Sequence, residues 1–410
     1  MTDELEVAVD LGERTVLAGI ARVDRRRNTT TTSFRYDPDY LADPASYPID
    51  PALPFESLGG VVPDLPGAFA DCAPDRWGRR LIAKWIRASE TGTPRTLGEV
   101  DYLLGVSDHT RQGALRFRLR GAANFQAAEG EVPRQIRLPE LLRAAEAVAS
   151  GRDDVDTSTI KVLLDAGTGT LGGARPKASV ISDDDVLSIA KFPHPHDEWD
   201  VMAWEKTALD LAEHAGIDVP RRLLVTISGK SVLLLERFDR RRGHRVGYVS
   251  GMTVVQGRDG DDHDYLDLAA ELGAISAAAD DDLAQLWRRI AFSVAIHNTD
   301  DHLRNHGVIR AASAWRLSPV FDVNPNPDVA EERVTGIGGA TARADEIPAL
   351  LSIAADLGLR RGEVEQVLAE VGAATATWRE TAAANGIAHG EIRRFEGAFE
   401  GLRDEFGTGS

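Results

Sequence analysis

The N-terminal part of the chain shows the alternation of apolar and polar positions that is typical of β-strands. Apolar residues recur along 7–9 with 16–20 and again along 29–36, and the polar stretch 24–28 separates the two runs. Successive side chains of a strand point to opposite faces of a sheet, so this period of two predicts a strand meander. We therefore expect a β-rich N-terminal subdomain over residues 1–125.

A helical period appears after the proline-rich stretch 38–66. The large apolar residues of 75–85 are three to four positions apart, which predicts a helix. The stretch 121–137 is rich in Gly, Ala and charged residues and is expected to be a linker, followed by a helix at about 138–149. A domain boundary is expected near this linker.

The pattern then changes to short β-like runs around one helical stretch. The runs lie at 178–181, 187–192, 223–227 and 232–238, and the helical stretch lies at 199–214. From residue 262 onward helical periodicity dominates, most clearly at 282–297. These patterns predict an α+β chain with a small, sheet-containing lobe over 138–240 and a larger, mainly helical lobe over 241–410.

Composition is that of a folded chain. Its 410 residues, 43% hydrophobic and 27% charged, suit more than one globular domain. The single cysteine, Cys72, cannot form an intramolecular disulfide, which favours a reducing compartment. The acidic N-terminus lacks the features of a secretory signal, and no stretch approaches the ~18 apolar residues of a membrane span, so we expect a cytoplasmic protein without membrane contact.

Net charge bears on possible partners. The formal charge of −18 argues against direct binding of nucleic acid, whose affinity for proteins comes largely from Lys and Arg. Any DNA contact is expected to come through a basic partner. The arginine runs at 25–27 and 240–242 are expected to be solvated turns.

A glycine-rich segment is the first candidate for chemistry. Residues 167–172 read GTGTLG, and glycines let backbone N–H groups approach phosphate oxygens. A dinucleotide-binding turn requires a helix directly afterwards, but Pro176 and a strand-like run follow. A Walker A loop at 228–231 is excluded because Leu224 occupies the position of its first glycine. The context favours a kinase-type phosphate loop, although a plain flexible loop has the same composition.

Lys191 is the second candidate, because it lies inside an apolar strand-like run. A lysine there either reaches solvent from an edge strand or is paired, since burying an unpaired ammonium is costly. In kinases a strand lysine reaches the ATP phosphates and pairs with a helix glutamate, for which Glu205 is the candidate.

The third candidate is the polar run at residues 297–305, directly after a predicted helix. Asp300 and Asn305 have the spacing of the catalytic Asp and the metal-binding Asn in protein kinases. A polar helix cap, or a divalent-metal site made by the three histidines His297, His302 and His306, are the alternatives.

Two further segments complete the pattern. The strand-like run 315–323 contains a single carboxylate, Asp322, which is where a kinase needs a second acidic ligand for magnesium. The apolar run 233–235 leads into a charged segment ending at Arg240, as expected for a hinge strand that offers backbone groups to adenine. A glycine loop, a strand lysine, Asp-x4-Asn and a later Asp in this order are much less probable by chance than any one of them.

With these residues assembled, the chain resembles the HipA family of toxin-antitoxin serine/threonine kinases over nearly its full length. The motifs that carry the resemblance are DRWGRRL at 75–81, GGARPKA at 172–178, IAKFP at 189–193, ERFDR at 236–240, the run 298–305 and SPVFD at 318–322. The resemblance implies a two-lobed, protein-kinase-like fold with an N-terminal β-rich subdomain.

The resemblance also implies roles for individual residues. Asp300 would be the catalytic base, and Asn305 and Asp322 would bind Mg²⁺. The ATP-binding set would comprise Gly172, Gly173, Ala174, Arg175, Lys177, Lys191, Glu236, Arg237, Phe238, Asp239, His302 and Phe321. Within it Lys191 would contact the phosphates, residues 236–238 would hold adenine, and Asp239 would approach the ribose. Thr170 is the candidate for autophosphorylation.

Members of this family typically pair with a small DNA-binding antitoxin of the HipB type and phosphorylate a protein, in the best-known cases an aminoacyl-tRNA synthetase. This chain departs from the family in having Asp301 where glycine is frequent and Arg304 where lysine is common. A small-molecule kinase with the same lobes, and a catalytically weak interaction or repressor component, remain the competing hypotheses.

Overall fold

The computed structural model describes residues 2–26, 29–89, 95–125, 132–151, 156–167, 175–312 and 314–401. The chain divides into two compact units, each made of two stretches of sequence. The first unit comprises residues 1–196 and 226–249, and the second comprises 197–225 and 250–410. Among the described residues, no helix is long and apolar enough to cross a membrane.

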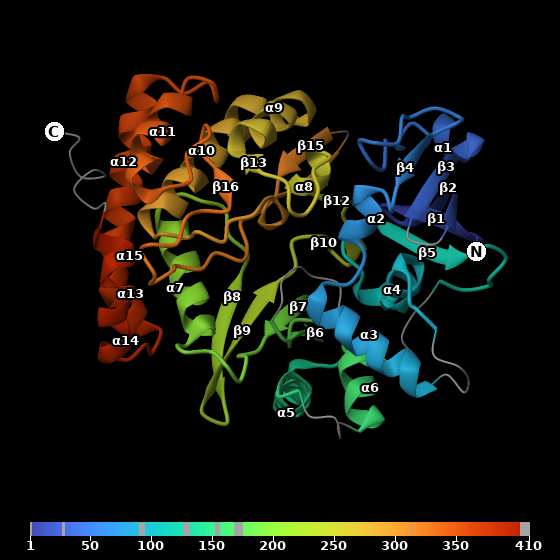
Figure 1. Ribbon diagram of the computed structural model, residues 1–410, viewed down its shortest axis with the longest axis horizontal. Coiled ribbons are helices and arrows are strands. Elements are labelled where there is room, and N and C mark those ends of the chain that lie inside the picture. Colours follow the sequence, from blue (N-terminus) through green and yellow to red (C-terminus); the bar gives the residue numbers. More distant parts are fainter. Residues whose placement is uncertain are drawn as a thin grey trace. The chain divides into compact units, whose positions relative to one another are not determined.

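The expected β-rich start is an antiparallel sheet in the first unit (Figure 1). Within the described residues its strand order is β4-β3-β2-β1-β5. The strands are β1 (Thr2–Leu11), β2 (Arg14–Arg26), β3 (Thr29–Tyr36), β4 (Gly60–Pro63) and β5 (Leu115–Leu119). Alternate residues of β1, Leu5, Val7 and Val9, are fully buried, as the period of two predicts.

The meander differs from the prediction at one place. β2 does not break at residue 24 but continues to Arg26, where Asp24 and Arg25 pair with Thr31 and Thr30 of β3. Arg25 is not a solvated turn residue either, because its guanidinium reaches Asp3 at 2.9 Å. These polar residues continue the strand because their backbones pair with β3 and the Arg25 side chain has a charged partner.

The first unit also contains six helices within its described residues. They are α1 (Pro38–Ala42), α2 (Gly67–Asp71), α3 (Arg76–Ser89), α4 (Glu99–Gly105), α5 (Leu138–Ala149) and α6 (Thr157–Asp165), with single 3-10 turns at Asp108–Thr110 and Gln135–Arg137. The predicted helices at 75–85 and 138–149 are therefore confirmed. α3 buries Trp77, Leu81 and Ile82 and packs against α6.

A second antiparallel sheet has the order β6-β7-β9-β8 within the described residues. Its strands, β6 (Lys177–Ile181), β7 (Leu187–Lys191), β8 (Arg222–Ile227) and β9 (Lys230–Glu236), lie where the β-like runs predicted them. Short strands follow at β10 (Arg240–Arg241), β11 (His244–Arg245) and β12 (Tyr248–Ser250). The hairpin of β6 and β7 pairs Lys177 with Lys191, so both lysines lie at the same end of the sheet.

The second unit is mainly helical, as predicted. Its helices are α7 (Val201–His214), α8 (Gly251–Val254), α9 (Tyr265–Ile275), α10 (Ala279–Ala295), α11 (Glu346–Ile353), α12 (Arg361–Thr375), α13 (Trp378–Ala384), α14 (His389–Arg394) and α15 (Glu396–Glu400), with 3-10 turns at Leu303–Asn305 and Arg343–Asp345. Its strands are β13 (His263–Asp264), β14 (Gly307–Ala311), β15 (Ala314–Leu317) and β16 (Thr335–Gly336).

Helix α10 lies at the centre of this unit, in contact with α9, α11 and α12 (Figure 1). Leu286, Trp287 and Ile290 of α10 are fully buried, and the Trp287 indole donates a hydrogen bond of 3.0 Å to the carbonyl oxygen of Leu350. This packing fixes the C-terminal end of α10, from which the polar run 297–305 continues.

Candidate active site

The polar run after α10 is held in place by main-chain contacts. His297 has a left-handed backbone conformation (φ 52°), which turns the chain sharply away from the helix axis. Its carbonyl oxygen accepts a hydrogen bond of 2.9 Å from the Asn326 amide, and the carbonyl oxygen of Thr299 accepts one of the same length from Val334. The loop therefore lies against the segment 324–334 and is defined on both sides of Asp300.

Asp300 and Asn305 lie together, as their spacing predicts. The Asn305 side-chain nitrogen donates a hydrogen bond of 3.2 Å to the carbonyl oxygen of Asp300. Because the amide nitrogen is used for this contact, the amide oxygen Oδ1 is the end of Asn305 that can bind a cation. Asp300 itself is exposed, whereas Asn305 is buried.

The Asp322 carboxylate lies close enough to Asp300 for the two negative charges to repel each other. The strand predicted over 315–323 ends at Leu317, and the chain continues in irregular form to Asp322, whose backbone is left-handed (φ 57°). Two residues later the Asn324 amide donates a hydrogen bond of 3.3 Å to the Asn298 side chain, which joins the two loops. The strand prediction holds only as far as Leu317, because beyond Ser318 the chain leaves its partner β14: the Val320 amide donates to the carbonyl oxygen of Asp218 instead.

The electrostatics of Asp300 reflect its neighbours. Although Asp300 reaches the surface, the protein atoms around its carboxylate partly exclude water and so raise its pKa; His302 opposes this shift, and the negative charge of Asp322 adds to it. Two carboxylates that repel each other in this way form a site that a divalent cation would stabilise. His302 is half-buried, and its Nδ1 has no hydrogen-bond partner within the described residues.

Behind the loop, Asp301 is the centre of a buried polar cluster. Its carboxylate accepts hydrogen bonds from the Tyr265 hydroxyl at 2.5 Å and from His306 Nε2 at 3.0 Å, and its carbonyl oxygen accepts one from Thr335 Oγ1 at 2.7 Å. Burial disfavours its charged form, but the attraction of His306 and the hydrogen bonds from His306 and Tyr265 outweigh burial and lower the pKa of Asp301 to about 2. Asp301 thus anchors the residue next to Asp300.

The spacing of these residues along the sequence did not predict this cluster. Tyr265 begins α9 and Arg333 precedes β16, where Arg333 donates to Glu346 at 2.7 Å and to Tyr265 at 3.4 Å. The one available signal was Asp301 itself, an acidic residue where the related family often has glycine. The alternative of a three-histidine metal site gains no support, since no group of three or more His, Cys, Asp or Glu suited to a metal occurs in the described ranges.

The two predicted nucleotide-binding lysines, Lys177 and Lys191, lie on the second sheet. Lys191 ends β7 and is 8% exposed, so it is not an edge lysine pointing to solvent. Its proposed partner Glu205 is buried in α7 and belongs to the second unit, and their pairing stays a prediction. Lys177 forms an ion pair with Asp75 at 2.7 Å, and both side chains are buried.

Part of the glycine-rich segment can be placed. Thr170, Gly172, Gly173 and Ala174 lie outside the described residues, whereas Arg175 is half-buried just before β6. Gly167, the first glycine of the motif, ends helix α6: its backbone is left-handed (φ 62°), and its amide donates to the Leu164 carbonyl oxygen at 2.9 Å.

The predicted hinge follows β9. Glu236 is the last residue of that strand, and Phe238 contacts the ring of Tyr248 with centroids 6.0 Å apart. Phe321, from the second unit, is half-buried and directly precedes Asp322. The backbone of residues 236–238 is thus placed at a strand end, as the hinge prediction requires.

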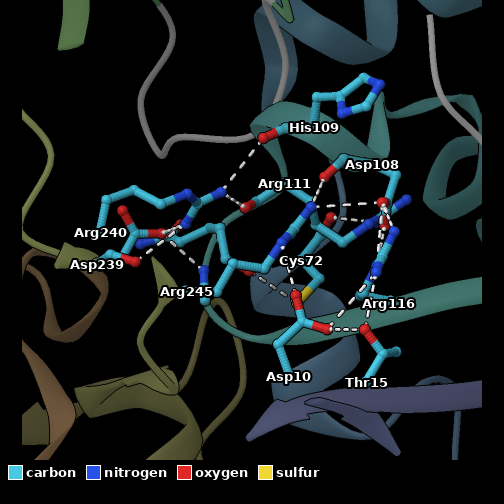
Figure 2. Close-up of polar contacts among 12 residues, drawn as sticks. Asp10, Thr15, Cys72, Asp108, His109, Arg111, Arg116, Asp239, Arg240 and Arg245 are labelled. Carbon is cyan, nitrogen blue, oxygen red and sulfur yellow. Dashed lines mark hydrogen bonds and ion pairs between the residues drawn. The ribbon is translucent and has the colours of Figure 1, made fainter. Parts of the chain in front are cut away.

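The charged side chains of this hinge make contacts inside the first unit. The Asp239 carboxylate is 4% exposed and accepts hydrogen bonds from Arg237, Arg240 and the Gly113 amide, and its approach to a ribose stays a prediction. The Arg237 side chain is likewise buried, against Asp239 and the carbonyl oxygen of Thr110. Arg240 is not a solvated turn residue, because its guanidinium forms an ion pair with the buried Asp239 carboxylate (Figure 2).

Fold and site together define a two-lobed, kinase-like α+β protein. The HipA-like C-terminal domain family matches residues 169–378, just over half of the chain, so the chain belongs to this family.

The fold agrees with solved structures. A chain from the Shewanella oneidensis MR-1 complex of HipA, HipB and operator DNA matches with a TM-score of 0.64 and 16% identity, over 99% of this chain and 96% of that one. This match confirms the predicted fold class. The Helicobacter pylori proinflammatory kinase CtkA matches with a TM-score of 0.39 and 16% identity, over 58% of this chain and 92% of that one. No curated protein matches the sequence.

Proposed function

We propose that this chain is an ATP- and magnesium-dependent serine/threonine protein kinase of the HipA toxin type. The observation that carries the proposal is the loop that places Asn305 against Asp300 while contacts with Asn298 hold the segment of Asp322 beside it. Family membership and fold support the same activity class.

Each residue would have one task. Asp300 would orient the substrate hydroxyl and accept its proton while the hydroxyl oxygen forms a bond to the γ-phosphorus and the bond to the β-phosphate oxygen breaks, releasing ADP. Asn305 Oδ1 and the Asp322 carboxylate are oxygen donors of the kind that Mg²⁺ prefers, and they would hold it. When bound, Mg²⁺ supplies charge neutralisation for the phosphates.

Most of the residues proposed to bind the nucleotide belong to the first unit. Lys191 would contact the phosphates, with Glu205 as its partner, and the backbone of residues 236–238 would contact the adenine edge. Arg175, Lys177, His302 and Phe321 would complete the ATP site together with the glycine-rich segment. Domain boundaries at about 125–138 and 240 remain part of this proposal.

Partners and location follow from the same family assignment. The matched Shewanella chain comes from a complex with HipB and operator DNA, and we infer a basic, HipB-type antitoxin as partner for this chain of net charge −18. DNA would then be contacted through that partner. The substrate would be a protein, and the enzyme would act in the cytoplasm.

The proposal is tested by incubating the protein with γ-labelled ATP and Mg²⁺ in a cell lysate and identifying labelled proteins. Asp300→Asn keeps the size of the side chain but removes the base, so transfer should fall by several orders of magnitude while the circular dichroism spectrum is unchanged. A folded Asp300→Asn protein with near wild-type transfer would refute the assignment. Label appearing only in small molecules would favour a small-molecule kinase, and tight ATP binding without transfer would favour an interaction component.

A further inference from the structure

Residues 236–245, here called the hinge segment, have three arginine side chains that are buried in the interior of the first unit. The side chains of Arg237, Arg240 and Arg245 are 1%, 10% and 10% exposed. Arginines so deeply buried need partners for their charge and for their N–H groups. Those partners identify what holds the segment in place.

All three arginines converge on the turn Asp108–Thr110 and the residue after it. Arg237 donates to the carbonyl oxygen of Thr110 at 2.5 Å, Arg240 donates to that of Arg111 at 2.8 Å, and Arg245 donates to that of Asp108. Figure 2 shows the dashed lines that join Arg240 and Arg245 to this turn. The turn is therefore a common anchor for the start, the middle and the end of the hinge segment.

Asp239 closes this arrangement from within the hinge segment. Its carboxylate pairs with Arg237 and Arg240 and also accepts a hydrogen bond of 2.8 Å from the Gly113 amide. Burial alone would raise the pKa of Asp239, but the two arginines lower it far below its usual value, so the group is ionised at neutral pH. The hinge segment is thus joined to the chain just before β5.

A second layer joins the turn to the N-terminal sheet. The Asp108 carboxylate is 2% exposed and pairs with Arg116 of β5 at 2.5 Å and with Arg245 at 3.4 Å. Asp10 of β1 also pairs with both arginines, with Arg245 at 3.2 Å and with Arg116 at 3.5 Å (Figure 2). Two carboxylates from the N-terminal part therefore share the same two guanidinium groups.

We propose that Asp108 is a positioning residue for nucleotide binding: through Arg245 it fixes the hinge segment, so that the N-terminal sheet sets the affinity for the adenine base. The inference rests on the proposed function in one respect, that residues 236–238 contact adenine. Removing the Asp108 charge leaves the buried Arg245 guanidinium with less negative charge beside it. The end of the hinge segment at Arg245 then becomes more mobile. The base-reading backbone then fluctuates, whereas groups that bind the phosphates are untouched.

The experiment compares wild type with Asp108→Asn by the dissociation constants of Mg-ATP, Mg-GTP and magnesium tripolyphosphate. We expect Asp108→Asn to weaken ATP binding by about tenfold and to reduce the preference for ATP over GTP, with tripolyphosphate affinity unchanged. A purely structural defect would weaken all three ligands together. Asp108→Glu, which restores the charge, should recover part of the ATP affinity.

Glu6→Gln is the matched control. Glu6 of β1 pairs with Arg118 of β5 at 2.6 Å, in the same sheet and with the same kind of partner, but within the described residues neither forms a hydrogen bond or ion pair with the hinge segment. Its ATP affinity should equal that of wild type. If Asp108→Asn does not fold, Arg245→Lys, which keeps the charge and loses the fork, replaces it with the same expectation.

Hydrogen exchange gives a readout that does not depend on nucleotide. Amides of residues 236–246 should exchange about tenfold faster in Asp108→Asn than in wild type, with exchange in α10 unchanged. Unchanged exchange and unchanged ATP affinity in a folded Asp108→Asn protein would overturn the inference alone. Wild-type protein that binds no nucleotide would overturn the proposed function and, with it, the adenine part of the inference.

Discussion

Lys177 and Asp75 are 102 residues apart in the sequence and form an ion pair of 2.7 Å in the interior of the first unit. Asp75 also accepts a hydrogen bond of 2.7 Å from the Gly78 amide, so one carboxylate caps the start of α3 and neutralises a buried lysine of β6. Two motifs that carried the family resemblance, DRWGRRL and GGARPKA, thus meet in space.

This contact predicts a large loss of stability for Asp75→Asn. Asparagine still caps the helix, so the change isolates the charge, and removing one partner of a buried ion pair typically costs about 3–5 kcal/mol. Urea unfolding followed by circular dichroism measures the free energy of unfolding. The double variant Asp75→Asn with Lys177→Met should be more stable than Asp75→Asn, and a single variant as stable as wild type would contradict the buried pairing.

Acid sensitivity should depend on Asp301. Its pKa is about 2 in the folded protein against an ordinary value of 3.8, so the stabilisation is complete above the ordinary value and is lost as the pH falls through the folded value. The difference corresponds to about 2 kcal/mol at neutral pH. Unfolding free energies measured from pH 6 to pH 3 should fall less steeply in Asp301→Asn than in wild type. Identical slopes would show that the carboxylate is not held as described.

Magnesium-dependent nucleotide binding should depend on Asp322. Asp322→Ala removes a carboxylate proposed to hold Mg²⁺, so the dissociation constant of Mg-ATP should rise about tenfold or more. Calorimetric titration with Mg-ATP measures this, and titration with ATP in the presence of a chelator is the control, in which wild type and variant should agree. An unaltered Mg-ATP affinity would remove Asp322 from the site.

Autophosphorylation is predicted at Thr170, which lies outside the described residues. A phosphate would add about −1.5 to −2 charges beside a segment proposed to cradle ATP phosphates, so it should expel the segment and switch the enzyme off. Intact-mass analysis after incubation with Mg-ATP should show slow gain of one phosphate on residues 167–177, absent in Thr170→Ala. An active enzyme without phosphate there refutes the switch.

Local signals allowed much of the fold to be predicted. Helices α3, α5 and α10 and strands β6 to β9 follow from periodicity, because each buries one face or alternates across a sheet. The contact of Asn305 with Asp300 was also predictable, since both belong to one short turn, in which the Asn305 side-chain nitrogen reaches the carbonyl oxygen of Asp300. Structure that depends on residues close together in the chain can therefore be predicted from a single sequence.

Contacts between distant residues were not predictable. The roles of Arg237 and Asp239 depend on a turn more than 120 positions earlier, and their charged sequence resembled an exposed strand end. Gly167 matched a phosphate-loop pattern, yet a Cβ there would lie 2.1 Å from Thr110 Oγ1, so glycine is required where the end of α6 packs against that turn. In both cases the missing information is which segment lies opposite.

The anchoring of the hinge segment also has a consequence for biosynthesis. The turn Asp108–Thr110 leaves the ribosome well before Arg237, Arg240 and Arg245, and at ordinary rates of translation the delay is on the order of 10 s. During that interval the Asp108 carboxylate has Arg116 but not Arg245, and the main-chain carbonyl oxygens of the turn remain hydrated. The first unit takes up residues 226–249 only after 29 residues of the second unit have been made, so it cannot complete its folding before residue 249 has been synthesised.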